Sequence, residues 1–251
     1  MKGRTLGAIL PGDGFPLIMA AVIDVQQLRV VLDGRVVIED LSFRLDQGEN
    51  LAIIGPNGAG KTVLLRALLG LVPYSGRIVW APDVKLGYVP QKIDADRHLP
   101  MSAGDLLAAK LRILGLPEDG AAEALEIVGL PPETLRRPIG LLSGGQFQKA
   151  LIAFALLGRP NLMLFDEPTA SLDAPAEEHI YSLIQRLQEQ FGITVIVVSH
   201  DLSMVYRFAT QVLCLNRQGA CFGSPHEILT PDSLERLYGA PYRFYHHEHT
   251  P

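Results

Sequence analysis

The loop at residues 55–62 constrains this chain more than any other part of its sequence. It consists of Gly55, Pro56, Asn57, Gly58, Ala59, Gly60, Lys61 and Thr62. A short apolar run, 51–54, precedes it, and a helical pattern that continues through Gly70 follows it. The glycines allow consecutive backbone N–H groups to turn toward a phosphate at the positive end of that helix. This strand–loop–helix pattern predicts a phosphate-binding loop, in which Lys61 reaches the β- and γ-phosphates and Thr62 binds Mg²⁺.

Two carboxylates, Asp166 and Glu167, follow a second apolar run at 162–165. The first is suited to hold Mg²⁺, directly or through water, and the second to orient and deprotonate an attacking water. Two acids after a strand are often only part of a solvated loop. Downstream of a phosphate-binding loop, however, the pair predicts a metal-holding acid and a general base.

The other apolar patterns predict strands that alternate with helices. Strands are predicted at 22–31, 36–45, 51–54, 78–80, 85–89, 162–165, 194–198 and 211–215, and helices at 106–114, 118–128, 145–157 and 173–190. The first two strands form a hairpin through Asp33-Gly34. The alternation predicts a parallel sheet covered on both faces, and the mostly helical block 92–154 predicts an inserted helical subdomain.

The two ends of the chain differ from this central part. Residues 1–21 are rich in Gly and Pro and lack periodicity, so we expect a poorly ordered lead before a domain at 22–236. Residues 237–251 form a tail with three histidines, His246, His247 and His249. We expect no signal peptide and no membrane span, because no apolar run reaches the roughly 18 residues that a spanning helix needs.

Further motifs accompany the loop and the acidic pair. Residues 142–146, Leu-Ser-Gly-Gly-Gln, open a predicted helix, and Ser-Leu-Asp follows the acidic pair at 171–173. Gln91 lies two residues after the strand predicted at 85–89, and His200 lies two residues after the strand predicted at 194–198. In this order and spacing, the motifs resemble those of ATP-binding cassette (ABC) ATPases over about residues 22–230. The resemblance implies an α/β fold: a RecA-like P-loop NTPase core with an antiparallel β subdomain and an inserted helical subdomain.

The family's mechanism implies a role for each motif. Two cassettes form a head-to-tail homodimer in the ATP-bound state, so that each ATP lies between two chains. Residues 55–62 of one chain bind it together with Ser143, Gly144, Gly145 and Gln146 of the other. The implied catalytic residues are Lys61, Gln91, Glu167 as general base, and His200 at the γ-phosphate. The implied Mg²⁺ ligands are Thr62, Gln91 and Asp166, and Gln91 also links the nucleotide to a membrane partner.

Some residues depart from the family's pattern. The aromatic residue that usually stacks on adenine falls on Leu32 here, and no aromatic occurs between Phe15 and Phe43. We therefore expect weaker ATP affinity and poor discrimination against GTP. Val63, Lys149 and Phe154 also replace common family residues, but none of these changes removes an implied catalytic group.

The chain carries a single cassette, which narrows its role within the family. The short stretch between Gln91 and Ser143 has no room for the coiled coil of repair proteins, and we expect no membrane domain fused to the cassette. Its net charge of −5 argues against nucleic acid as a partner. We expect an ATPase subunit of an importer with separate permease subunits, located peripherally on the cytoplasmic face of the bacterial inner membrane.

The transported substrate is inferred from weaker similarities. Residues 86–91, 212–216, 223–225 and 237–239 resemble ATPase subunits of zinc/manganese importers, as does the histidine-containing tail. The resemblance thus implies zinc or manganese import and, indirectly, an extracytoplasmic metal-binding protein. An iron–siderophore or lipid transporter and a non-transport nucleotide switch remain alternatives. The tail itself is either a metal sensor or a solvated terminus.

Overall fold

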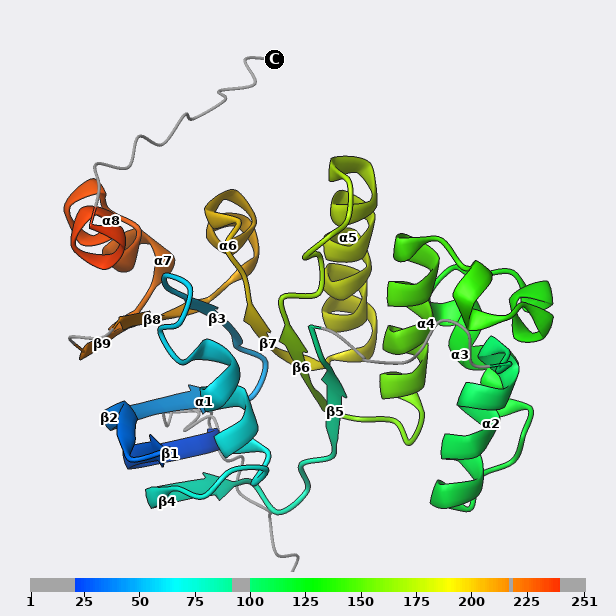
Figure 1. Ribbon diagram of the computed structural model, residues 1–251, viewed down its shortest axis with the longest axis horizontal. Helices are drawn as coiled ribbons and strands as arrows, with labels where there is room; N and C mark the ends of the chain where they lie inside the picture. Colours follow the sequence, from blue (N-terminus) through cyan, green and yellow to red (C-terminus); the bar gives the residue numbers. More distant parts are fainter. Residues whose placement is uncertain (1–20, 92–99, 217–218, 240–251) are drawn as a thin grey trace, which may run out of the picture.

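The computed structural model describes residues 21–91, 100–216 and 219–239 (Figure 1). The predicted lead at 1–21 lies outside this range except for Ala21, which begins the first strand. The tail histidines at 246, 247 and 249 also lie outside it, so the prediction for the tail is not tested.

A six-stranded sheet forms the centre of the molecule. Its order is β5 (Leu86–Val89), β6 (Leu162–Asp166), β7 (Thr194–Val198), β3 (Asn50–Ile54), β8 (Gln211–Asn216) and β9 (Gly219–Gly223). The first five strands are parallel, as predicted, and β9 pairs antiparallel with β8 at the edge. The carboxyl ends of the parallel strands therefore meet at one edge of the sheet.

A second, antiparallel sheet has the order β2-β1-β4. It contains β1 (Ala21–Leu32), β2 (Arg35–Asp46) and β4 (Ser75–Trp80). Asp33 and Gly34 both have positive φ, 48° and 74°. This is the conformation of a two-residue hairpin turn that matches strand twist, so the predicted hairpin is confirmed.

Apolar side chains cover both faces of the central sheet. Because successive side chains on a strand alternate, Leu51 and Ile53 pack with α1 and the antiparallel sheet. Ala52 and Ile54 face the opposite core, which includes side chains of α2 to α6 and α8. Burial of both faces explains why β3, β6 and β7 read as continuous apolar runs.

The predicted helices are all present, with small changes in their ends. The helices are α1 (Lys61–Leu68), α2 (Ala103–Leu114), α3 (Gly120–Ile127), α4 (Gly144–Leu156), α5 (Ala174–Phe191), α6 (Leu202–Phe208), α7 (Pro225–Ile228) and α8 (Pro231–Tyr238). Two 3₁₀ turns, Pro132–Arg136 and Ile139–Leu141, connect α3 to α4. Helices α2, α3 and α4 pack on one another, although the limits of a helical subdomain at 92–154 stay a prediction.

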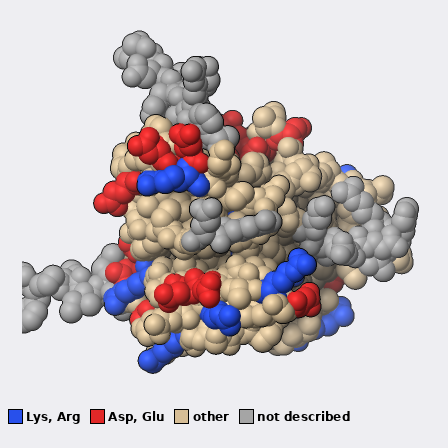
Figure 2. Space-filling model, turned by 60° about the vertical axis from the view of Figure 1, so that its left-hand side comes forward, with Lys and Arg blue, Asp and Glu red and all other residues tan. Residues whose placement is uncertain are grey.

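Short elements after residue 200 were not predicted from sequence. Strand β9 is mostly exposed and begins and ends with glycine, so it has no buried alternation that sequence could reveal. Helices α6 and α7 span only two turns or fewer. None of the helices among the described residues is long and apolar enough to cross a membrane. Acidic and basic side chains both occur on the face shown in Figure 2.

Candidate functional site

The predicted residues meet at the carboxyl ends of four neighbouring strands. Gln91 lies just beyond β5, Asp166 and Glu167 lie at the end of β6, and His200 lies just beyond β7. The loop 55–60 follows β3, which pairs with β7. Ligands of open α/β sheets bind at this edge, and the strand order brings together side chains that are far apart in sequence.

Two glycines of the loop have positive φ and lie close to neighbouring strands. Gly55 has φ 147°, and a Cβ atom on it would lie 2.1 Å from the carbonyl oxygen of Leu215 in β8. Gly60 has φ 98°, and a Cβ atom there would lie 3.0 Å from Cγ1 of Val37. A side chain at residue 55 would therefore collide with the backbone of β8, whereas one at residue 60 would require a small shift of Val37 and would strain the backbone at its positive φ.

The first turn of α1 is built to receive an anion. Its N-cap residue, Gly60, has no side chain that could accept a hydrogen bond from the helix. The amides of the first turn have no acceptor within an α-helix, and the helix dipole adds positive potential there. By contrast, Ser102, Ser143 and Asp173 cap α2, α4 and α5 with their side chains. The geometry of α1 thus fits the predicted phosphate site.

Lys61 is held over the loop. Its side chain is only 6% exposed, and its Nζ donates hydrogen bonds to the carbonyl oxygens of Gly55 at 2.9 Å and Pro56 at 3.2 Å. Nζ also lies 3.7 Å from Oε1 of Glu167. A buried ammonium costs free energy unless it is paired, so these contacts keep the charge beside the first turn of α1.

Asp166 and Thr62 place two oxygens together. The Thr62 hydroxyl donates to Oδ1 of Asp166 at 3.1 Å, and Asp166 is 1% exposed. Burial raises the pKa of Asp166, whereas the Thr62 hydrogen bond and the charges of Arg66 and Lys61 oppose the rise. A carboxylate and a hydroxyl are the oxygen ligands that Mg²⁺ prefers. The donor set therefore fits the predicted metal site.

The backbone conformation of Glu167 and a hydrogen bond from Gln91 orient the Glu167 side chain. Its φ of 48° is in the left-handed region, which costs a non-glycine residue about 1–3 kcal/mol. Its N–H donates to the carbonyl oxygen of Val198 at 3.1 Å. Nε2 of Gln91 donates to its Oε2 at 2.6 Å. The predicted general base and the predicted link to a membrane partner are thus in direct contact.

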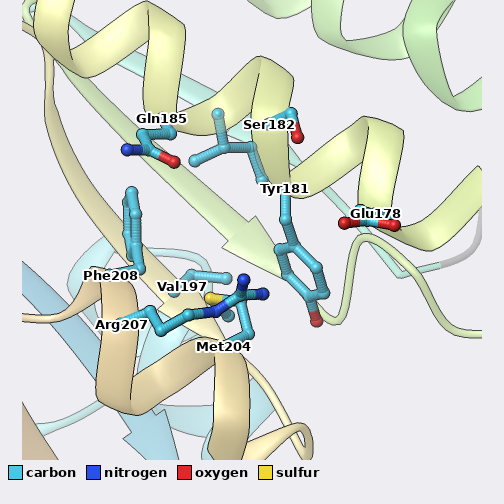
Figure 3. A pocket seen from close by; sticks show the side chains of 9 residues that line it. Glu178, Tyr181, Ser182, Gln185, Val197, Met204, Arg207 and Phe208 are labelled. Carbon is cyan, nitrogen blue, oxygen red and sulfur yellow. The ribbon is translucent and has the colours of Figure 1, made fainter. Parts of the chain in front are cut away.

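A chain of hydroxyl groups behind the site was not predicted. The Tyr181 hydroxyl lies 3.0 Å from Oγ1 of Thr169 and 3.1 Å from Oγ of Ser199, the residue before His200. Thr169 also donates to Oε1 of Glu177 at 2.8 Å. Figure 3 shows Tyr181 reaching from α5 along a hollow of about 300 Å³ that faces α6. The contacts join the segment after Glu167 to the segment that carries the exposed His200.

The structure does not bring residues 143–146 to the phosphate loop. Ser143 caps α4, because its Oγ accepts a hydrogen bond from the backbone N–H of Gln146 at 3.3 Å. In return, Oε1 of Gln146 accepts a hydrogen bond from the backbone N–H of Ser143 at 3.2 Å. A Cβ atom on Gly144 would lie 3.1 Å from Leu172, in the segment before α5. Figure 1 places α4 and α1 well apart. Within one chain, these four residues are therefore not part of the site.

Sequence comparisons identify related proteins. The family model described as ABC transporter matches residues 38–170. The zinc import ATP-binding protein ZnuC of Ruegeria pomeroyi is 41% identical over 219 residues, which cover 87% of this chain and 84% of that protein. ZnuC of Pseudomonas syringae pv. syringae is 39% identical over 233 residues, which cover 91% of this chain and 87% of that protein.

Solved structures give the same result. A chain of an inward-facing ABC transporter described as metal-chelate type matches with a TM-score of 0.81 and 30% identity, covering 88% of this chain and 90% of that one. CbiO1 of Clostridium perfringens, part of the transporter complex cbiONQ, matches with a TM-score of 0.72 and 28% identity, covering 86% and 93%. The predicted fold class is therefore confirmed.

Proposed function

The chain belongs to the ABC transporter family of ATP-hydrolysing subunits, and from this membership we propose that it powers zinc import through a separate membrane permease. The observation that carries the proposal is the meeting of residues 55–62, Asp166, Glu167 and Gln91 at one sheet edge. The choice of zinc rests on the zinc import proteins that are 37–41% identical over most of the chain.

The geometry supports the role that we propose for each site residue. The first-turn amides of α1 and Lys61 would bind the β- and γ-phosphates of ATP. Thr62, Asp166 and Gln91 would hold Mg²⁺, which when bound neutralises charge on the phosphate oxygens. Glu167 would orient a water in line with the γ-phosphate and accept its proton. His200, exposed beside the same edge, would contact the γ-phosphate.

A second copy of the chain would complete the site. The four residues at 143–146 lie away from the loop of their own chain. Two of them, Ser143 and Gly144, are exposed and therefore accessible to a second chain. In a head-to-tail homodimer these residues would meet the γ-phosphate bound to the partner subunit. Binding of ATP would then join the two chains, and its hydrolysis would release them.

The partners and location follow from this role. Permease subunits would bind the chain at the cytoplasmic face of the inner membrane. Gln91 would couple nucleotide binding and hydrolysis to these subunits, because its side chain contacts Glu167. An extracytoplasmic metal-binding protein would deliver zinc to the permease. The domain limits of 22–236 and 237–251, with a helical subdomain at 92–154, belong to the same proposal.

Uptake of radioactive zinc by cells that lack this protein tests the proposal. We expect uptake to fall, to recover when the native chain is supplied, and not to recover with Lys61→Ala, which removes the ammonium at the loop. Loss of manganese uptake with zinc uptake intact would reject zinc as the substrate. Unchanged uptake of both metals, with no stimulation of ATP hydrolysis by the permease, would favour the nucleotide switch.

Leu32 gives a separate prediction about nucleotide choice. It is half-buried at the end of β1, where the family's aromatic residue would stack on adenine. Leu32→Tyr should tighten ATP binding about 5- to 150-fold, because base–aromatic stacking contributes roughly 1–3 kcal/mol. Titrations with ATP and GTP would measure the change, with the exposed Leu71→Tyr as control. Strong adenine selectivity in the native chain would refute the assignment of Leu32.

A further inference from the structure

Two cysteines lie directly opposite each other at the edge of the central sheet. Cys214 in β8 pairs with Cys221 in β9 in an antiparallel register. Opposed residues in such a pair project to the same face with Cα atoms about 4.5 or 5.5 Å apart. Both separations fall within the range of about 4.4–6.8 Å found in disulfides. The backbone therefore permits a bond between the two sulfur atoms without a change of register.

The two thiols open onto a hollow of about 560 Å³ between the strand pair and α8. Cys214 is 3% exposed at its inner wall, whereas Cys221 is exposed on the edge strand. Among the described residues, Arg236 and Glu235 of α8 are the charged ones that line the hollow, and Ser233 lines it as well. A hollow of this size accepts a small molecule, and a molecule that enters it reaches Cys221 first.

The surroundings of the two thiols shift their pKa values in opposite directions. The hydrogen bond from Cys214, assisted by the charge of Arg236, lowers the pKa of Cys221 to about 7. The same hydrogen bond, together with burial, raises the pKa of Cys214. Because the thiolate is the nucleophile, Cys221 is the attacking group. Cys214 stays protonated as long as the Cys221 thiolate accepts its hydrogen bond.

A metal ion fits this place poorly. Arg236 puts positive charge beside the thiolate, and such charge favours an anion over a cation. No cluster of three or more His, Cys, Asp or Glu ligands occurs in the described part of the chain. Glu235 also lines the hollow, so the hollow suits a thiol-reactive molecule that carries both carboxylate groups, for Arg236, and an ammonium group, for Glu235.

We propose that Cys221 is a modification site for small acidic disulfides, with Cys214 as the resolving thiol. The Cys221 thiolate attacks a disulfide RSSR, forms the mixed disulfide Cys221–S–S–R and releases RS⁻. Modification removes the thiolate that held the Cys214 proton, so Cys214 loses that proton to solvent and attacks Sγ of Cys221. A second RS⁻ leaves, and both RS⁻ take up protons. Two protein thiols are oxidised to one disulfide, and one RSSR is reduced to two RSH.

The product would lie close to the phosphate loop. Cys214 pairs with Ile54 at the end of β3, and the next residue, Leu215, supplies the carbonyl oxygen that packs against Gly55. The bond would tie edge strand β9 to β8 one residue from that contact. This inference does not depend on the transported substrate.

Oxidised glutathione is the probe that tests the proposal on the full chain. We expect the native protein to lose both free thiols and two hydrogens, without keeping a glutathionyl group. Cys214→Ser should keep one glutathionyl group on Cys221, and Cys221→Ser should stay unmodified. Peptide mapping of the native protein after brief exposure, before resolution, should find the first adduct on Cys221 and so avoids dependence on the variants. A first adduct on Cys214, or no reaction of either cysteine, would overturn the proposal.

The pH dependence of alkylation by iodoacetamide gives a second test. The Cys221 rate should be half-maximal near pH 7 and level off by about pH 8, because its pKa is about 7. An ordinary thiol, with a pKa of about 8.5, would still gain reactivity above pH 8. Such ordinary behaviour would overturn the proposal, as would protection of both thiols by micromolar Zn²⁺, which would assign the pair to a metal instead.

Discussion

Replacing Glu167 by glutamine should lower the rate of ATP hydrolysis by about 10²- to 10⁴-fold, the usual contribution of a positioned general base. The amide keeps the size of the side chain but cannot accept a proton from water. Gln91 holds Oε2 of the native carboxylate at 2.6 Å, so the base is aimed before the nucleotide binds. Phosphate release and ATP binding should be measured on the same preparations, because we expect binding to stay within a few-fold of the native value.

The matched control for this variant is Glu126→Gln, which makes the same chemical change on the exposed surface of α3. Its hydrolysis rate should equal that of the native chain. The Glu167→Gln variant should also accumulate as a dimer with ATP in size-exclusion experiments, because the nucleotide that joins the chains persists. A Glu167→Gln rate within threefold of the native rate would assign the general base to another residue.

Local patterns in the sequence predicted the loop at 55–62 and the pair Asp166–Glu167, whereas the roles of Gln91 and His200 came from the resemblance to the family. The loop at 55–62 and the pair Asp166–Glu167 follow continuous apolar runs, and those runs read as strands because both faces of β3 and β6 are buried. Parallel pairing then places their ends together. This prediction, that the loop and the acidic pair lie at one edge of the sheet, does not require the order of the strands to be known.

Other features depend on contacts between distant elements and could not be predicted. The Gln91–Glu167 hydrogen bond requires β5 to lie next to β6, which only the assembled sheet decides. Tyr181 lies on a helix where its position reads as an ordinary core residue, so its hydroxyl contacts left no signal in the sequence. The cysteine pair was equally hidden, since its partner strand β9 has no pattern of its own.

Gly55→Ala should both destabilise the protein and weaken ATP binding. The new Cβ would lie 2.1 Å from the Leu215 carbonyl oxygen, so either the loop or β8 must move. The left-handed backbone costs about 1–3 kcal/mol, and forced overpacking costs about 1–3 kcal/mol more. Chemical denaturation should therefore show a loss of about 2–6 kcal/mol in the free energy of unfolding.

The variant Gly219→Ala separates the cost of the backbone conformation from the cost of the clash with a neighbouring atom. Gly219 has φ 155°, close to the 147° of Gly55, but no described atom lies within 4 Å of a Cβ built on it. This variant should lose only the backbone part, about 1–3 kcal/mol, and should bind ATP as the native chain does. Equal losses of stability in the two variants would mean that the contact with Leu215 relaxes at no cost. In that case the close approach of β8 would not be what fixes the phosphate loop, and the requirement for glycine at residue 55 would be one of backbone conformation alone.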